Sequence, residues 1–95
     1  MNQRRISERT DQIHRRFFKA VDDLIAMDKM PSFTSWCDGH GLHRPKYTTI
    51  RRFYKEGVVA DHMYKAIDLD ALAYLSADFG VSADWLLSGA GNEFK

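Results

Sequence analysis

The side chains best suited to chemistry in this 95-residue chain are basic and hydroxyl groups between residues 32 and 55. The segment PKYTTIRRFYK, residues 45–55, carries Lys46, Arg51, Arg52 and Lys55 without any acidic residue. Cationic side chains bind the phosphates of a polyanion, and an arginine can also form two hydrogen bonds with a guanine. These residue types indicate a nucleic-acid-binding helix that follows a short helix and a glycine turn.

A second pattern, C-x2-H-x2-H, is formed by Cys37, His40 and His43 and resembles the spacing of some zinc ligands. A fourth ligand is not evident, so we expect a buried thiol and a hydrogen-bonded histidine and no bound metal. The chain has no nucleophile elbow, no phosphate-binding glycine loop and no H-E-x-x-H motif. We therefore expect no enzymatic activity and no cofactor, and no small-molecule ligand is indicated.

Charge is distributed unevenly along the chain. Residues 1–65 hold 13 Lys and Arg against 8 Asp and Glu, a balance of +5, whereas residues 66–95 hold 1 against 5, a balance of −4. A clustered basic face matters more than net charge when the partner is a polyanion, although two solvated faces of opposite sign are the plainer alternative. No run of residues is long and apolar enough for a membrane span or a signal peptide. A single cysteine favours a reducing, cytoplasmic environment.

The elements that must position the basic residues are expected to be helices of one small domain. A buried stripe with a period of 3.6 residues predicts the first helix at residues 12–27; its members are Ile13, Phe17, Val21, Leu24 and Ile25. Ser32 is a suitable N-cap for a second helix at residues 33–40, and Gly41 supplies the left-handed conformation that ends it.

The basic helix is predicted to begin at Pro45, where a missing N–H group costs nothing. If Tyr47, Ile50 and Tyr54 face the core, a rotation of about 100° per residue directs Pro45, Thr48, Thr49 and Arg52 to the opposite face. Arg51 then lies at the apolar edge, where it can extend to a phosphate or pair with an acid.

Two further helices are expected after a loop near residues 56–66. Asp68 is the N-cap of the first and Gly80 ends it, while Ser82 caps a last short helix that ends at Leu87. The predicted fold class is all-α, a compact five-helix bundle. Its parts are a basic N-terminal arm at residues 1–12, a domain at residues 13–91 and a tail at residues 92–95.

The segment LAYLSADFGVSADWLLSGAG, residues 72–91, carries the most specific resemblance to a known family. It is similar to the end of Cro/CI-type (XRE) helix-turn-helix domains, the lambda-repressor-like DNA-binding domains. Gly41, Leu42 and Ile50 also fall where that family has its turn and a core residue of its recognition helix. The resemblance implies a transcriptional regulator of bacterial or phage type, nucleoid-associated and with double-stranded DNA as its partner.

The chain departs from the family pattern at several positions. Phe33 stands where the family often has a glutamine that binds phosphate, and His40 stands where it has an apolar residue. Gly39 precedes the same turn, and the link between the third and fourth helices is about ten residues longer than usual.

The expected DNA contacts fall into three groups. Base reading is assigned to Pro45, Thr48, Thr49 and Arg52. Phosphate contacts are assigned to Ser32, Thr34, Ser35, Arg44, Lys46, Arg51 and Lys55. Arg4 and Arg5 of the arm are expected to follow the DNA backbone or enter a minor groove.

The favoured function is sequence-specific binding by a homodimer without a separate effector domain, because proteins of this class pair to read two half-sites. The candidate interface residues are Trp85, Leu86, Leu87 and Phe94, or the apolar positions of residues 58–59 and 63–64. Two alternatives stay open. One is an architectural or accessory DNA-binding protein of a phage or mobile element, and the other is a protein-interaction module that has lost DNA binding.

Overall fold

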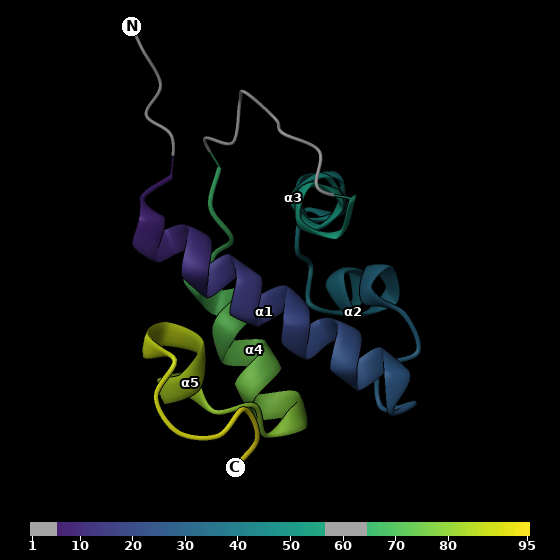
Figure 1. Cartoon of the computed structure of the whole chain (residues 1–95). Helices are drawn as coiled ribbons and strands as arrows, with labels where there is room; N and C mark the ends of the chain where they lie inside the picture. Colours follow the sequence, from purple (N-terminus) through teal and green to yellow (C-terminus); the bar gives the residue numbers. More distant parts are fainter. Residues whose placement is uncertain (1–5, 57–64) are drawn as a thin grey trace, which may run out of the picture.

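Five α-helices make up most of residues 6–56 and 65–95, the parts of the chain that this computed structural model describes (Figure 1). They are α1 (Glu8–Ala26), α2 (Phe33–Gly39), α3 (Arg44–Glu56), α4 (Leu69–Phe79) and α5 (Ala83–Ser88). The all-α class predicted from the sequence is confirmed for these residues, which contain no β-strand beyond one isolated bridge. Within the same residues, no helix has the length and apolar character needed to cross a membrane.

The signals that begin and end the predicted helices act as expected at most positions. The Oγ atoms of Ser32 and Ser82 accept hydrogen bonds from the backbone N–H groups of Ser35 and Trp85. Gly80 ends α4 in the left-handed conformation, and Gly41 has a φ angle of +68° in the turn after α2. Asp68 is the residue before α4, but its carboxylate makes no capping bond and is used elsewhere.

The beginning of α1 differs from the prediction. Ser7 caps the helix through its side chain, so α1 begins at Glu8 rather than at residue 12. A serine N-cap followed by acidic residues in the first turn stabilises the helix there, because both satisfy or complement its free N–H groups. Residues 8–12 of the expected arm are therefore helical, whereas Arg4 and Arg5 lie outside the described residues.

The last four residues do not form a free tail. The backbone N–H of Ser82 donates to the carbonyl of Glu93 at 2.8 Å, and that of Lys95 donates to the carbonyl of Gly80 at 2.9 Å. Lys19 of α1 also lies 2.8 Å from the Glu93 carboxylate. The tail predicted at residues 92–95 thus turns back and pairs with the segment that precedes α5.

The core is built around α1, which contacts α3 and α5, while α2 packs on α3 and α4 packs on α5. In Figure 1, α2 and α3 lie on one side of α1, and α5 lies on the other. Aromatic rings fill the space between α1 and α2; they belong to Phe17, Phe18, Phe33 and Trp36. Leu72 and Trp85 are partly buried against the core.

His14 is the buried polar residue that joins three elements. Its Nε2 accepts the backbone N–H of Ile67 at 3.1 Å, so the neutral ring carries its proton on Nδ1. That Nδ1 donates to the Tyr54 hydroxyl at 3.2 Å, and the hydroxyl donates to Asp11 at 2.7 Å. Burial lowers the pKa of His14 to about 4, opposed by the charge of Asp11 and reinforced by that of Lys46.

The His14 ring makes the stability of the fold depend on pH. The unfolded chain binds a proton near pH 6.5 and the folded chain only near pH 4, so stability falls as the pH is lowered between these values. The difference corresponds to on the order of 3 kcal/mol. We expect urea unfolding to show this loss, and the variant His14→Gln to lack the slope. Asp11, Asp68 and Asp78, whose pKa values are lowered, contribute only at more acidic pH. A wild-type stability that does not change from pH 6.5 to 4 would contradict the assignment.

Candidate nucleic-acid interface

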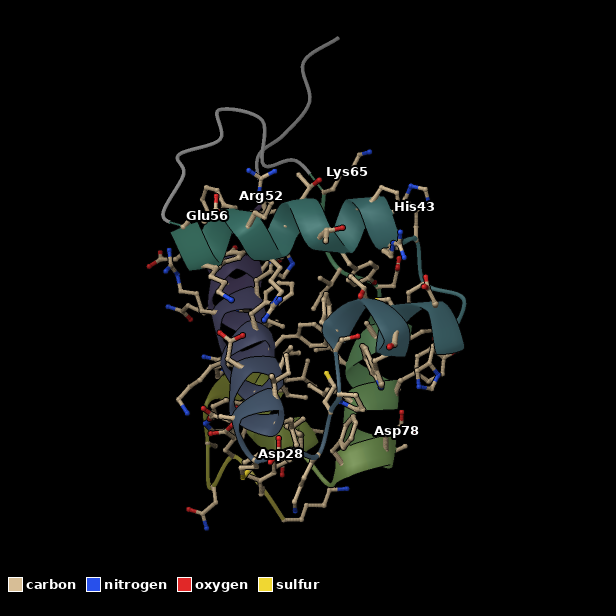
Figure 2. The ribbon with its side chains drawn as sticks, turned by 90° about the vertical axis from the view of Figure 1, so that its right-hand side faces the viewer. Asp28, His43, Arg52, Glu56, Lys65 and Asp78 are labelled. Carbon is tan, nitrogen blue, oxygen red and sulfur yellow. The ribbon has the colours of Figure 1, made fainter. Side chains whose placement is uncertain are left out.

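Helix α3 lies at the edge of the molecule and crosses α1 at a steep angle. Figure 1 looks along the axis of α3, whereas α1 lies across the same view. Figure 2 shows α3 along the top of the molecule, with Arg52 on the side that faces away from α1, α2 and α4. One long face of α3 is thus free of contact with other helices.

The inner face of α3 is held by two buried tyrosines, as the helical period predicts. Tyr47 and Ile50 are almost fully buried, and Tyr54 is partly buried. The Tyr47 hydroxyl donates to the carboxylate of Asp68 at 2.6 Å and accepts the backbone N–H of the same residue at 2.8 Å. The hydrogen bond from Tyr47 lowers the pKa of Asp68, which keeps the carboxylate charged. Tyr54, about two turns further along α3, joins this helix to α1 through Asp11.

The outer face of α3 carries the residues assigned to base reading. Pro45, Thr49 and Arg52 are exposed and Thr48 is half-buried, with 72% of the Arg52 side chain accessible. The hydroxyl of Thr48 donates to the carbonyl of Arg44, and that of Thr49 donates to the carbonyl of Pro45 at 2.8 Å. Both threonines can still offer their methyl groups and their acceptor lone pairs to a ligand. The Arg52 guanidinium lies 3.6 Å from the Glu56 carboxylate, and most of the Arg52 side chain remains accessible.

Three of the cations assigned to phosphate contacts are paired with acids. Arg51 lies 2.8 Å from Asp22 of α1, with only 22% of its side chain accessible and its guanidinium over the ring of Phe33. Lys46 lies 3.4 Å from Asp68 and is similarly covered, while the exposed Arg44 lies 3.3 Å from Asp38. Of the two alternatives expected for Arg51, this structure contains the pair with an acid, because the edge of the core holds the guanidinium against α1. Its assignment as a phosphate contact stays a prediction. Lys55 is exposed at the end of α3.

The hydroxyl groups at the beginning of α2 bond mainly to one another. Ser32 Oγ caps the helix and lies 2.8 Å from Ser35 Oγ and 3.5 Å from Thr34 Oγ1. Ser35 is exposed and Thr34 is half-buried. The structure thus brings the three expected phosphate-contacting hydroxyls together, with the capping role of Ser32 taking one of its lone pairs.

Position 33, which departs from the family pattern, is a core position. Phe33 is 2% exposed and packs against Phe17, Phe18 and Trp36. It therefore replaces a polar contact at the helix surface by hydrophobic burial.

The side chains of Cys37 and His40 lie in different environments. Cys37 is fully buried, and burial raises the pKa of its thiol to about 11. His40 Nε2 lies 2.6 Å from Asp78 of α4, and its ring stacks on Tyr74. The same carboxylate accepts the Trp36 Nε1–H at 2.9 Å. Among residues 6–56 and 65–95, no group of three potential metal ligands comes together.

Sequence reasoning missed the carboxylates that position α3. Asp11, Asp22 and Asp68 each receive a hydrogen bond from a side chain of α3 between 21 and 43 residues away in the chain. The sequence indicates these contacts only weakly. Asp11 lies one turn before His14 on the buried side of α1, and the position of Asp68 predicts an ordinary helix cap.

Comparison with protein-family models, with curated proteins and with solved structures finds no match to this chain.

The Tyr47 hydroxyl is expected to contribute measurably to stability. Tyr47→Phe leaves the Asp68 N–H and carboxylate without their buried partner, so we expect a loss of about 1–3 kcal/mol in the free energy of unfolding. Urea denaturation measures it. Tyr74→Phe is the matched control, because that ring lies in the middle of α4 and stacks on His40, away from Asp68. An equal effect of the two changes would show that the Asp68 contact has no special role.

Proposed function

We propose that this chain is a sequence-specific double-stranded DNA-binding protein, a small transcriptional regulator of the lambda-repressor-like, XRE helix-turn-helix kind. In this proposal α2 and α3 form the helix-turn-helix, and the outer face of α3 enters the major groove. The observation that carries the proposal is the division of α3 into two faces. One face is fixed by Tyr47 and Tyr54, and the other presents Pro45, Thr49 and Arg52 to solvent.

The chemistry of the outer face suits a base edge better than a flat anionic surface. Arg52 has a guanidinium that can make paired hydrogen bonds with guanine, worth about 1–3 kcal/mol of discrimination. The methyl groups of Thr48 and Thr49 suit contact with a thymine methyl, since their hydroxyl protons are bonded to α3 carbonyls. Lys55 and the hydroxyls of α2 supply contacts to the phosphates, which position α3 without reading sequence.

An architectural role on DNA is the second candidate. The observation that favours it is that the hydroxyl protons of Thr48 and Thr49 already bond to backbone carbonyls of α3. Among the four residues assigned to base reading, Arg52 is then the main hydrogen-bond donor for a base. Such a surface binds phosphates well and distinguishes bases weakly. Cytoplasmic location and association with the nucleoid follow from either form of DNA binding.

Selection from a randomised duplex library at near-physiological salt separates these functions. An enriched inverted repeat supports a sequence-specific dimer, and its spacing gives the distance between half-sites. Retention without enrichment supports the architectural role. No retention at any salt concentration contradicts DNA binding and points to a fold used for protein contacts.

Two variants, each of which removes one positive charge from α3, test the roles assigned to its basic residues. Arg52→Ala is expected to weaken the selected site by about 1–3 kcal/mol and to relax preference at one base pair. Lys55→Ala is expected to weaken all sequences alike and to reduce the slope of log K against log salt by about 1. Fluorescence anisotropy over a series of salt concentrations measures both.

Lys29→Ala is the matched control, because it removes one positive charge at the end of α1 beside Asp28, far from α3 in Figure 2. Lys46 is unsuited to this comparison, since it lies beside Asp68 and its loss disturbs the fold. Identical effects of Arg52→Ala and Lys55→Ala on every sequence would remove the base-reading assignment.

A further inference from the structure

A groove lined by apolar side chains runs between α4 and α5, which pack on each other (Figure 1). Its volume is about 400 Å³, within the range of small-ligand sites in proteins. Leu69, Leu72 and Ser76 lie on its α4 side at the spacing of one helical stripe, and Leu86 and Leu87 lie on its α5 side. No residue of α3 lines the groove, so it is separate from the surface proposed to meet DNA.

The groove leaves large apolar side chains in contact with water. Leu69 is 75% exposed and Leu87 is 47% exposed, two of the three large hydrophobic side chains that are exposed in the described residues. Exposed leucines that adjoin a hollow, instead of being scattered singly, are typical of a binding surface.

The residues that the sequence placed at a dimer interface differ in exposure. Leu87 borders the groove, whereas Leu86 is fully buried and Trp85 and Phe94 are partly buried in the core. The residue pairs 58–59 and 63–64 lie outside the described residues. Nine residues line the groove, whereas a stable protein interface uses about 20–30 residues on each side. The size of the groove therefore suits a small ligand better than a second protein chain.

The polar side chains of the groove lie at one of its ends. Ser76 lies one turn before Gly80 on α4, and the backbone N–H of Lys95 donates to the Gly80 carbonyl. No acidic side chain of the described residues lies within ion-pair distance of the Lys95 ammonium group. Leu69 and Leu72 lie toward the beginning of α4. The groove thus has one positively charged end and one apolar end.

The length of the groove limits the size of an occupant. Leu69 and Ser76 lie about 10 Å apart along the axis of α4, at about 1.5 Å per residue. An extended aliphatic chain advances about 1.3 Å per carbon, because its C–C bonds are about 1.5 Å long and meet at tetrahedral angles. A chain of about eight carbons therefore reaches from the charged end to the apolar end.

We infer that this groove binds a free aliphatic carboxylate with about eight to ten carbons. The carboxylate accepts hydrogen bonds from the Lys95 ammonium group and the Ser76 hydroxyl. The aliphatic chain lies along α4 and covers the apolar surface of Leu69 and Leu87, which favours binding through the hydrophobic effect. The sequence does not indicate this ligand, because the groove joins two helices and residue 95. The site is independent of the proposed function, since it contains no residue assigned to DNA.

A series of saturated carboxylates tests the length of the groove. Hexanoate, octanoate and decanoate are titrated below the concentrations at which they form micelles, with isothermal titration calorimetry as the measurement. We expect the dissociation constant to fall about two- to fourfold for each added methylene, because the groove covers the chain on one side. Beyond decanoate the affinity is expected to level off, since further carbons extend past Leu69 into water. No binding of decanoate, or an affinity that rises by the same factor through tetradecanoate, overturns the proposal.

The charged end is tested with Lys95→Gln and with decan-1-ol, which has the same chain without the charge. Lys95→Gln is expected to weaken decanoate binding about two- to fivefold, the range of an exposed ion pair, and to leave decan-1-ol binding unchanged. Lys29→Gln is the matched control, because it removes an exposed lysine outside the groove. A Lys95→Gln variant that binds decanoate as tightly as the wild type contradicts the assigned head-group contact.

The location of the site is tested by filling the groove. Ala73 is an exposed alanine of α4 that lines the groove, so Ala73→Phe occupies the space of the ligand without entering the core. We expect decanoate to bind this variant at least tenfold more weakly. Ala26→Phe, at an exposed position of α1, is the matched control, and circular dichroism shows that both variants keep their helices. Equal affinities of the two variants for decanoate overturn the location.

Other occupants of the groove give different results. If decanoate does not bind and wild-type protein forms dimers that Ala73→Phe abolishes, a second copy occupies the groove and the proposal is wrong. Binding to phosphatidylcholine vesicles without binding of free decanoate assigns the groove to a membrane surface and also refutes it. Failure of this site leaves the duplex-binding tests unaffected, because no residue of the groove is assigned to DNA.

Discussion

The position of α3 depends on a set of buried hydrogen bonds that begins at the hydroxyls of Tyr47 and Tyr54. Tyr47 joins α3 to the residue that precedes α4, and Tyr54 joins it to α1. His14 closes the arrangement, because its two ring nitrogens bond Tyr54 and the backbone of Ile67. The hydroxyls of Tyr47 and Tyr54 and the Nδ1 of His14 thus each have an acceptor, and a buried donor without one is costly. A helix that must meet a ligand along its outer face benefits from an inner face fixed in this way, because its register cannot slide without breaking these bonds.

The acids of the C-terminal third have roles within the fold that account for their concentration there. Asp68, Asp78 and Glu93 pair with Lys46, His40 and Lys19 of the basic part of the chain. Asp70 and Asp84 lie in the first turns of α4 and α5, where a negative charge complements the helix dipole. Two of the five acids, Asp68 and Glu93, are therefore joined to lysines of the basic part inside one domain.

The helices, their caps and the buried side of α3 could be predicted from the sequence, because each depends on contacts within a few residues. Ser32, Ser82 and Gly80 act locally, and the period of Tyr47, Ile50 and Tyr54 is a property of one helix. The partner of Arg51 could be narrowed to a phosphate or an acid, but Asp22 is 29 residues away and only packing of α3 on α1 selects it. The return of the chain at Glu93 depends in the same way on a distant partner, Lys19.

The pairing of basic residues with acids also limits the positive charge that α3 presents to solvent. Arg51 and Lys46 are engaged at the inner edges of α3, so its outward positive charge comes mainly from Arg44, Arg52 and Lys55. The affinity of a protein for DNA rises with the number of phosphates that its cations neutralise. Under the proposed function, electrostatic contacts of α3 alone therefore give a weak complex at physiological salt, and the contacts of its outer face with base edges have to supply the remaining affinity.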